Sequence, residues 1–303
     1  MESRNAYLFL FPNLIGTVGF VLIPFMDVFR RSCLRAVGSG FTGLSNYREV
    51  LRNKAFRLAA ANTLKFIAVC LPLLLSFSLC IAVMFWSAAD RGGGRKKDGT
   101  KDRWGNMGWM KTGFTLPMAV PAASVSVFFQ MLFDEKGWLN LLANRLGFPG
   151  ADWLNCRYAF WVLTACYVWK NLGYDMILWL TGIAGIGKEQ YEAARVEGAG
   201  EFACFAYITL PQLKETAYVT TLLSFVNAFR VFREAYLLSG DYPHESIYML
   251  QHLFNNWFVS LDIQKLTAAA SLLVIMTGGL LFGLGMLLRF FGYGCSRQIR
   301  RKD

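Results

Sequence analysis

Residues 66–89 read FIAVCLPLLLSFSLCIAVMFWSAA and contain no charged side chain. A bilayer with a hydrocarbon core of about 30 Å is crossed by roughly 20 helical residues, so this run is long enough to span it. Three further uncharged runs occupy residues 5–26, 112–133 and 266–288. Lipid offers backbone N–H and C=O groups no partner, and the crossing segments must therefore be helices. The four runs predict an all-α membrane protein and disfavour a large soluble protein with buried helices.

Composition and charge agree with a membrane protein. Of 303 residues, 55% are hydrophobic and 16% aromatic, while the formal net charge is +11. In a soluble protein this charge would suggest nucleic-acid binding, but the cations lie in flanks and loops, without a zinc-finger, cold-shock or RNP pattern. The first apolar run is longer than the roughly 7–15 residues of a signal-peptide core, and no small-x-small cleavage site follows it. We therefore expect it to be a retained span.

Two weaker apolar segments complete a set of six expected spans. The fourth is interrupted by Lys170 and Asp175, and the second half of the fifth carries Arg230, Arg233 and Glu234. We expect a single transmembrane domain over residues 1–303. Its spans are expected at about residues 6–29, 60–88, 111–133, 158–183, 216–238 and 266–290.

Loop charges give the expected topology. Residues 90–103 read DRGGGRKKDGTKDR, and the positive-inside rule places this loop in the cytoplasm. Six spans then leave both termini cytoplasmic, which agrees with the basic tail at residues 297–302. Seven Lys and Arg residues between positions 30 and 57 oppose this orientation. Some of these cations fall in an expected amphipathic surface helix at residues 43–51. In that helix, Asn46 and Glu49 have capping-box spacing. A second surface helix is expected within residues 134–157.

The most informative polar stretch lies between the fourth and fifth spans. Residues 187–211 read GKEQYEAARVEGAGEFACFAYITLP. Residues 189–196 favour a short helix, and Gly198 and Gly200 permit a tight reversal by accepting dihedrals closed to other residues. A second short helix is expected to continue to Pro211, which suits the first turn of the next span because it has no N–H. The sequence thus predicts a helix-turn-helix that can bind a partner.

This stretch resembles the cytoplasmic EAA loop of ABC importer permeases, whose pattern is Glu-Ala-Ala, three residues, Gly, nine residues, then Ile-x-Leu-Pro. In that family the helix-turn-helix docks in a cleft of the ATP-hydrolysing subunit and passes its movement to the membrane helices. An ordinary amphipathic connector is the alternative, and a Glu-Ala-Ala triplet alone would carry no weight. The resemblance implies an ATPase docking site at the matching positions, Glu192, Ala193, Ala194, Gly198, Ile208, Leu210 and Pro211.

Weaker similarities favour the maltose-type carbohydrate branch of the family. Residues 6–12, 43–47, 115–117 and 169–174 are similar to segments of its sugar permeases. The chain departs from the pattern in having SGDYP after the fifth span, where a glycine-proline turn is common, and Arg233-Glu234 in place of an Asp-Glu pair. The sequence does not distinguish among a monosaccharide, an oligosaccharide, a polyol and a sugar phosphate as the solute.

The resemblance also implies partners and a location. We expect a second homologous permease, two ATP-binding subunits that hold ATP and Mg, and an extracytoplasmic solute-binding protein, in the cytoplasmic membrane of a prokaryote. The chain itself is expected to bind no cofactor or metal and to be no enzyme, since its sequence has no Ser/His/Asp arrangement, metal-ligand cluster or nucleotide motif. The alternative is an ion-coupled carrier or channel, which would need no ATPase and would leave residues 189–211 unexplained.

Ionisable residues within spans usually face a cavity or one another. One hypothesis is that six polar residues line the solute pathway, Lys170, Asn171, Tyr174, Asp175, Asn227 and Arg230. The alternative is that Lys170 pairs with Asp175, or an arginine with Glu234, only to hold helices together. Trp179, Trp257 and Phe258 could stack on sugar rings or form an interfacial belt.

The seven cysteines are scattered without metal-ligand spacing. Most are expected to be buried, inert thiols. Cys33 and Cys156 are both expected near the outer face. A disulfide between them is the alternative to free thiols.

Overall fold

Helices make up the regular structure of this computed structural model, which describes residues 2–35, 40–92, 113, 116–117 and 119–299. Within these ranges no strand occurs, and one isolated bridge pairs Leu34 with Phe41. The predicted all-α fold is therefore confirmed. The chain divides into two units, the first comprising Met1–Ala60 and Met249–Phe282, the second Ala61–Tyr248 and Gly283–Asp303.

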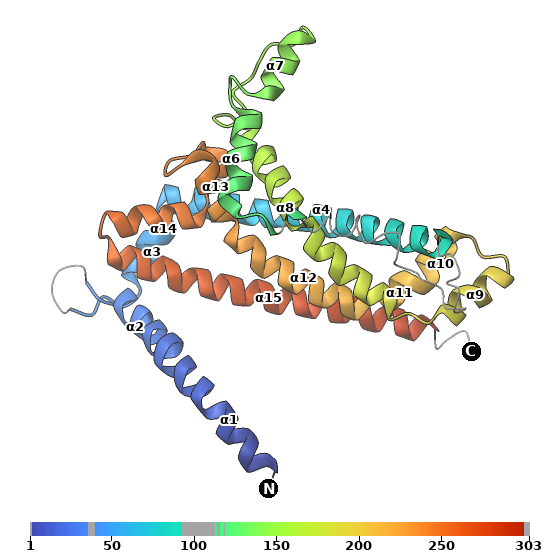
Figure 1. Cartoon of the computed structure of the whole chain (residues 1–303). Helices are drawn as coiled ribbons and strands as arrows, with labels where there is room; N and C mark the ends of the chain where they lie inside the picture. The colour runs from blue at the N-terminus through green and yellow to red at the C-terminus, as the bar shows by residue number, and fades with distance from the viewer. Residues whose placement is uncertain (1, 36–39, 93–112, 114–115, 118, 300–303) are drawn as a thin grey trace. The chain divides into compact units, whose positions relative to one another are not determined.

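The first unit begins with an unbroken helical run formed by α1 (Glu2–Thr17), a π-helical turn η1 (Val18–Leu22) and α2 (Ile23–Ser32) (Figure 1). It covers the expected first span. Its apolar side chains are unpacked within the chain, with Phe20 87% and Met26 66% exposed. Such a helix needs lipid or another subunit around it.

Helix α3 (Ser45–Arg52) forms where a surface helix is expected. The capping-box prediction is wrong, because Leu44 is the N-cap and makes no side-chain cap. Asn46 instead donates from its Nδ2 to the carbonyl oxygens of Ser32 (2.8 Å) and Leu34 (2.9 Å). A tertiary contact to the end of α2 has replaced a local cap.

The first unit is completed by α14 (Leu250–Val259) and the start of α15 (Ile263–Ile299). Lys265 Nζ lies 2.8 Å from Asp262 Oδ2 and 3.2 Å from Glu49 Oε1, which links α15 to α3. Helix α15 covers the expected sixth span, and its last residues belong to the second unit. Part of the expected basic tail, residues 300–302, lies outside the described residues.

The second unit is organised around α8 (Ala159–Ala184), which contacts α6 (Ala122–Phe133), α12 (Lys214–Ala228), α13 (Phe232–Ser239) and the short η4 (Glu245–Ile247). A 3-10 turn η3 (Phe229–Val231) joins α12 to α13 without a gap. Figure 1 shows α7 (Trp138–Arg145) and α9 (Lys188–Val196) at opposite ends of α8. The expected fourth and fifth spans, and the surface helix within residues 134–157, are thus all helical.

Helix α4 (Lys54–Gly92) covers the expected second span, and most of it belongs to the second unit. Its Ala82, Phe85 and Trp86 pack in a core cluster with Trp179 and Ile183 of α8. The indole Nε1 of Trp179 also donates to Ser78 Oγ at 3.0 Å. Trp179 is 5% exposed, so it fills the core of this unit.

The expected third span is only partly described. Residues 116, 117 and 119 are helical, the chain opens at residues 120–121, and α6 then begins after Pro121 as its N-cap. The basic loop at residues 93–103 also lies outside the described residues.

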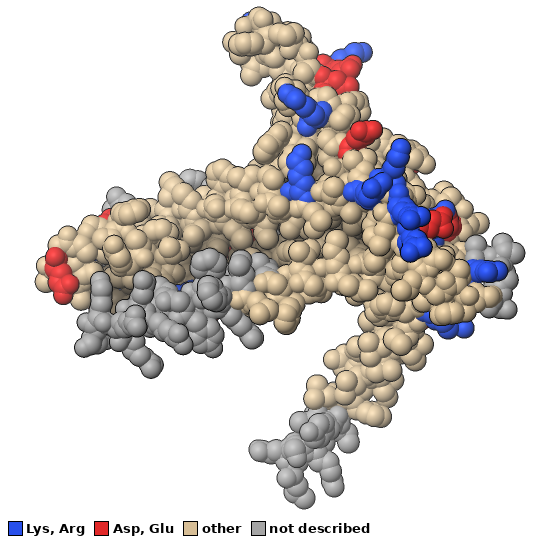
Figure 2. All heavy atoms as spheres, turned by 180° about the vertical axis from the view of Figure 1, so that it is seen from behind, with Lys and Arg blue, Asp and Glu red and all other residues tan. Residues whose placement is uncertain are grey.

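Three helices are long and apolar enough to cross a membrane among the residues described, over Leu10–Ser32, Lys54–Ala88 and Ile263–Gly283. Large uncharged areas are visible on the face drawn in Figure 2, where charged side chains gather in patches. Exposed apolar side chains on spans, such as Phe77 and Phe282, are consistent with lipid contact.

Candidate functional site

The polar stretch between the expected fourth and fifth spans folds as a helix-turn-helix, which we call the elbow (residues 188–212). It consists of α9 (Lys188–Val196), a turn, and a continuous run of α10 (Glu201–Cys204), the π-helical turn η2 (Phe205–Thr209) and α11 (Leu210–Gln212). Figure 1 shows these elements together at the end of α8. The predicted helix-turn-helix is present.

The turn of the elbow is set by one glycine. Gly198 has φ +88°, in the left-handed region that side chains other than glycine avoid. The Gly198 N–H donates to Arg195 O (3.1 Å) and the Ala199 N–H to Ala194 O (2.9 Å), the hydrogen-bond pattern of a Schellman helix end. The expectation for Gly200 is wrong, because its φ of −73° and ψ of 169° are extended backbone open to any residue.

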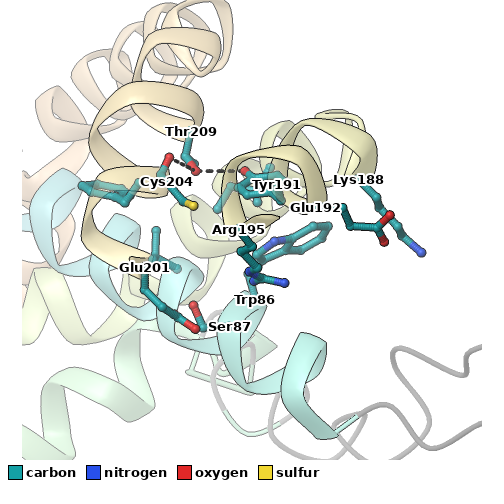
Figure 3. Close-up of a pocket in the computed structure, with 12 residues that line it drawn as sticks. Trp86, Ser87, Lys188, Tyr191, Glu192, Arg195, Glu201, Cys204 and Thr209 are labelled. Carbon is teal, nitrogen blue, oxygen red and sulfur yellow. Dashed lines mark hydrogen bonds between the residues drawn. The ribbon is translucent and has the colours of Figure 1, made fainter. Parts of the chain in front are cut away.

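The two arms of the elbow are joined by a small buried core. Ile186, Tyr191 and Cys204 form its buried cluster, and the Tyr191 hydroxyl lies 2.8 Å from Thr209 Oγ1 (Figure 3). Ala194, Ala199 and Ile208 pack against this cluster. Because buried hydroxyls need partners, the Tyr191–Thr209 pair fixes the angle between α9 and η2.

The core divides the seven motif positions into two groups. Ala194 and Ile208 pack inward and hold the elbow together. The remaining five do not belong to the core cluster. Glu192, Ala193, Gly198 and Leu210 are exposed, and Pro211 is half-buried.

Pro211 lies at the start of α11, before the Leu213 N-cap of α12. It therefore precedes α12, the helix at the expected fifth span, and does not lie within it. This corrects the expected position, although its missing N–H suits the start of α11 equally well.

Three strongly exposed apolar residues of the elbow were not singled out from the sequence. Val196 is 89% exposed, and Phe202 and Tyr207 are each 82% exposed. Tyr191 and Ala194 stand three residues apart on the inward face of α9, so helical spacing could have assigned Val196 to the outward face. Apolar side chains this exposed mark a surface for another molecule.

Two polar pairs lie inside the helical bundle of the second unit. Lys170 Nζ of α8 lies 2.5 Å from Glu234 Oε1 of α13, with both side chains largely buried. Ser224 Oγ of α12 lies 2.8 Å from each oxygen of Asp175, which is 1% exposed. Lys170 thus pairs with Glu234 rather than with Asp175. Buried charges are costly unless they are paired in this way.

The other residues expected to line the solute pathway differ in their exposure and hydrogen bonding. Asn171 Nδ2 donates to Tyr167 O (2.8 Å) within α8, while Tyr174 and Asn227 are half-buried and Arg230 is exposed. The structure brings Lys170 and Asp175 into the bundle, each with a partner from a different helix. Whether these side chains meet a solute stays a prediction.

Cys33 and Cys156 are both free thiols, so the disulfide alternative is wrong. In the described part of the chain, no group of three His, Cys, Asp or Glu side chains could hold a metal ion. Of the aromatic residues considered for sugar stacking, Trp179 is buried, Trp257 half-buried and Phe258 61% exposed.

Three long apolar helices in the described part of the chain, together with a folded polar elbow between α8 and α12, indicate a helical membrane protein with a site for a partner. The chain belongs to the family of binding-protein-dependent transport system inner membrane components, whose model matches residues 103–301. This family consists of ABC transporter permeases. Nothing in the comparisons supports the alternative of an ion-coupled carrier or channel.

Relatives match along most of their length. The probable ABC transporter permease protein YurN of Bacillus subtilis is 28% identical over 95% of this chain and 96% of its own. The trehalose/maltose transport system permease protein MalF of Thermococcus litoralis is 28% identical, covering 85% of this chain and 84% of the relative. The arabinooligosaccharides transport system permease protein AraP of B. subtilis is 30% identical, over 78% and 72% respectively.

The fold is also found in a solved transporter. A chain in the crystal structure of a bacterial ABC transporter involved in the import of the acidic polysaccharide alginate has a TM-score of 0.79. It is 18% identical, and the match covers 95% of this chain and 96% of that chain. At this identity the likeness establishes the fold alone.

Proposed function

We propose that this permease moves a carbohydrate-type solute across the cytoplasmic membrane of a prokaryote, driven by ATP that partner subunits hydrolyse. The observation that carries the proposal is the elbow, a helix-turn-helix with a buried core and the exposed apolar residue Val196, in a chain of the ABC permease family. The carbohydrate class is supported by relatives named as transporters of trehalose/maltose and arabinooligosaccharides.

The proposed topology has six spans and both termini in the cytoplasm. The spans are the α1–α2 run, α4, the segment that ends with α6, α8, the α12–α13 run, and α15. In the fourth and fifth of these, Lys170 is paired with Glu234, and the Asp175 carboxylate accepts a hydrogen bond from Ser224, which lowers the cost of placing these groups in a membrane. The elbow then lies on the cytoplasmic side, together with the basic loop at residues 90–103.

The elbow is proposed to pass movement between an ATP-binding subunit and the bundle. Glu192, Ala193, Val196 and Gly198 form the outward surface that would enter a cleft of that subunit. The inner core makes the elbow move as one piece, since Tyr191 of the first arm is bonded to Thr209 of the second. Displacement at the tip would therefore reach α8 through Ile186 and α12 through α11.

The proposed particle contains this chain, a second homologous permease, two ATP-binding subunits with their ATP and Mg, and an extracytoplasmic solute-binding protein. Lys170, Asn171, Tyr174, Asp175, Asn227 and Arg230 remain our candidates for the polar solute pathway. The chain binds no cofactor in this proposal, and a binding assay on the partner solute-binding protein would identify the solute.

Docking is tested by placing a charge on the elbow tip. Val196→Asp should abolish co-purification of the ATP-binding subunit and reduce uptake to background, because a buried unpaired carboxylate opposes an apolar contact. Leu146→Asp is the matched control, since Leu146 is an exposed apolar residue (66%) of the segment after α7. It should leave the complex intact.

Two results would contradict the proposal. Val196→Asp could retain a full complement of the ATP-binding subunit, which would remove the elbow tip from the docking surface. Uptake that persists in vesicles without any ATPase subunit would instead favour an ion-coupled carrier.

A further inference from the structure

Helix α3 connects the ends of two long apolar helices. Of the helices long enough to cross a membrane, Leu10–Ser32 ends before α3 and Lys54–Ala88 begins directly after it. Asn46 Nδ2 donates to the carbonyl oxygen of Ser32 (2.8 Å), and the Tyr47 hydroxyl lies 2.6 Å from Ser32 Oγ. Since α3 is bonded to the end of the first helix and joined to the start of the second, it lies at the membrane surface if both helices are spans.

The contacts of α3 leave one of its faces open. Val50 is 0% exposed, and Glu49 Oε1 lies 3.2 Å from Lys265 Nζ of α15. The open face carries positions 44, 48, 51 and 52, which helical spacing brings together. It forms a groove of about 670 Å³, all within the first unit. The groove is lined by Leu44, Ser45, Tyr47, Arg48, Leu51 and Arg52.

The two arginines are the charged groups that this groove offers. Among the described residues, neither Arg48 nor Arg52 has an ion-pair or hydrogen-bond partner for its side chain, and both are exposed. The Tyr47 hydroxyl is already bonded to Ser32 Oγ, so the tyrosine contributes its ring. Glu49 lines an adjoining hollow, but its carboxylate is paired with Lys265. The groove is therefore positively charged.

The same excess of positive charge extends over the neighbouring surface. The described carboxylates of the first unit are those of Asp27, Glu49 and Asp262, and each lies within 3.2 Å of a cation. Within the described ranges, five exposed cations of this unit are left without a carboxylate, namely Arg35, Arg48, Arg52, Lys54 and Arg57. In the proposed topology these residues lie on the outer side, where the positive-inside rule does not explain them.

The lining indicates an amphiphile with an anionic headgroup. A guanidinium can donate two parallel hydrogen bonds to a phosphate group, so a phosphodiester suits Arg48 and Arg52. Leu44 is 73% and Leu51 52% exposed, and an acyl chain beside them would remove apolar surface from water. Inorganic phosphate would use the arginines but leave both leucines in water. An interfacial helix with cations beside apolar side chains is typical of contact with anionic lipid.

We propose that the groove of α3 binds an anionic phospholipid of the phosphatidylglycerol class. Arg48 and Arg52 hold the phosphate, and Leu44 and Leu51 contact the upper part of an acyl chain. The lipid restrains α3 and, through Ser32, the end of the first long helix. The choice of the outer leaflet rests on the topology in the proposed function, whereas binding to the groove does not. The cations that oppose the positive-inside rule then include ligands for lipid.

A photoreactive side chain in the groove gives a direct readout. Leu51 is replaced by p-benzoylphenylalanine, and the importer is reconstituted in vesicles with equal amounts of dioleoyl phosphatidylglycerol and dioleoyl phosphatidylcholine. After illumination, peptide mass spectrometry identifies the adducts at position 51. The phosphatidylglycerol adduct should exceed the phosphatidylcholine adduct about fivefold or more, because one cation near an anionic surface favours binding by about that factor.

A pair of double variants localises the preference. Arg48→Gln with Arg52→Gln should bring the ratio of the two adducts close to equality. Lys54→Gln with Arg57→Gln removes the same charge from exposed positions outside the lining, and most of the preference should remain. Native mass spectrometry gives a second measurement without the photoreactive residue. The protein with Arg48→Gln and Arg52→Gln should retain less phosphatidylglycerol than the unmodified protein.

The proposal is overturned if the two lipids form adducts equally with both arginines present. Equal loss of preference in both double variants would indicate a diffuse basic surface and also overturn it. Added inorganic phosphate that abolishes the lipid adduct would make this a free-phosphate site. A crosslink to the solute-binding protein in place of lipid would make it a protein interface. If no ATP-binding subunit purifies with the chain, the proposed function fails, while the adducts still test the groove.

Discussion

The elbow and the bundle of the second unit use polar residues in opposite ways. In the elbow, the hydrogen bonds that set the shape join residues of one short stretch, such as Ala194 with Ala199 and, 18 residues apart, Tyr191 with Thr209. In the bundle, Lys170 and Glu234 are 64 residues apart, and Asp175 and Ser224 are 49 apart. The elbow can therefore fold from local information and present its charges outward. The bundle pairs form only when separate helices pack, and they keep charges inside.

This difference predicts that removal of one polar group lowers the free energy of unfolding by different amounts in the two regions. The largest loss is expected in the bundle. Glu234→Ala leaves Lys170 buried without its carboxylate, and breaking a buried pair from one side costs about 3–5 kcal/mol. The measurement is thermal unfolding of the purified protein in detergent. A double variant with Lys170→Met and Glu234→Leu should recover most of the lost stability, because no charge is left unpaired.

The double variant also tests whether the Lys170–Glu234 pair has a role in transport or only in packing. If it folds and transports normally, the pair serves only to hold α8 against α13. If it folds and no longer transports, Lys170 or Glu234 acts on the solute or on the moving helices. If Glu234→Ala is as stable as the unmodified protein, Lys170 and Glu234 are not buried together. The contrast between the bundle and the elbow would then be wrong.

A smaller effect is expected at the elbow turn. Gly198→Ala places a side chain in left-handed backbone, which costs roughly 1–2 kcal/mol. Gly200→Ala is the matched control two residues away, because extended backbone accepts alanine without strain. Amide exchange of α9 and ATP-driven uptake should both change for Gly198→Ala and stay nearly unchanged for Gly200→Ala. Equal effects would mean that the turn is not set by the left-handed residue.

The smallest effect is expected from a single hydroxyl in the elbow core. Tyr191→Phe removes one of two hydrogen-bond partners of Thr209, the other being Cys204 O at 3.4 Å, and a hydrogen bond of this kind contributes about 1 kcal/mol. Exchange in α9 should become several-fold faster, since 1.4 kcal/mol corresponds to about tenfold. Tyr207→Phe is the control, as Tyr207 is 82% exposed. Faster exchange in both variants would show that the buried hydroxyl has no special part in joining the arms.

Much of the fold, including the helix-turn-helix of the elbow, could be predicted from sequence. Uncharged runs gave the positions of long helices, because a bilayer demands both length and internal hydrogen bonding. The elbow was predictable because helix formers, a glycine and a second helical stretch follow one another within 25 residues, at positions 187–211. The motif spacing could not separate its inward Ala194 and Ile208 from its outward Glu192 and Ala193, since that depends on what the second arm covers.

The sequence by itself determined where most of the described helices lie, that the chain belongs in a membrane, and that a helix-turn-helix follows α8. These features depend on hydropathy and on backbone preferences of neighbouring residues. Tertiary structure alone decided that Lys170 meets Glu234, that Asn46 bonds the end of α2 instead of capping α3, and that a cavity opens beside Trp86. Each of these depends on side chains from separate helices, and the distance between such side chains is not encoded in any short stretch of residues.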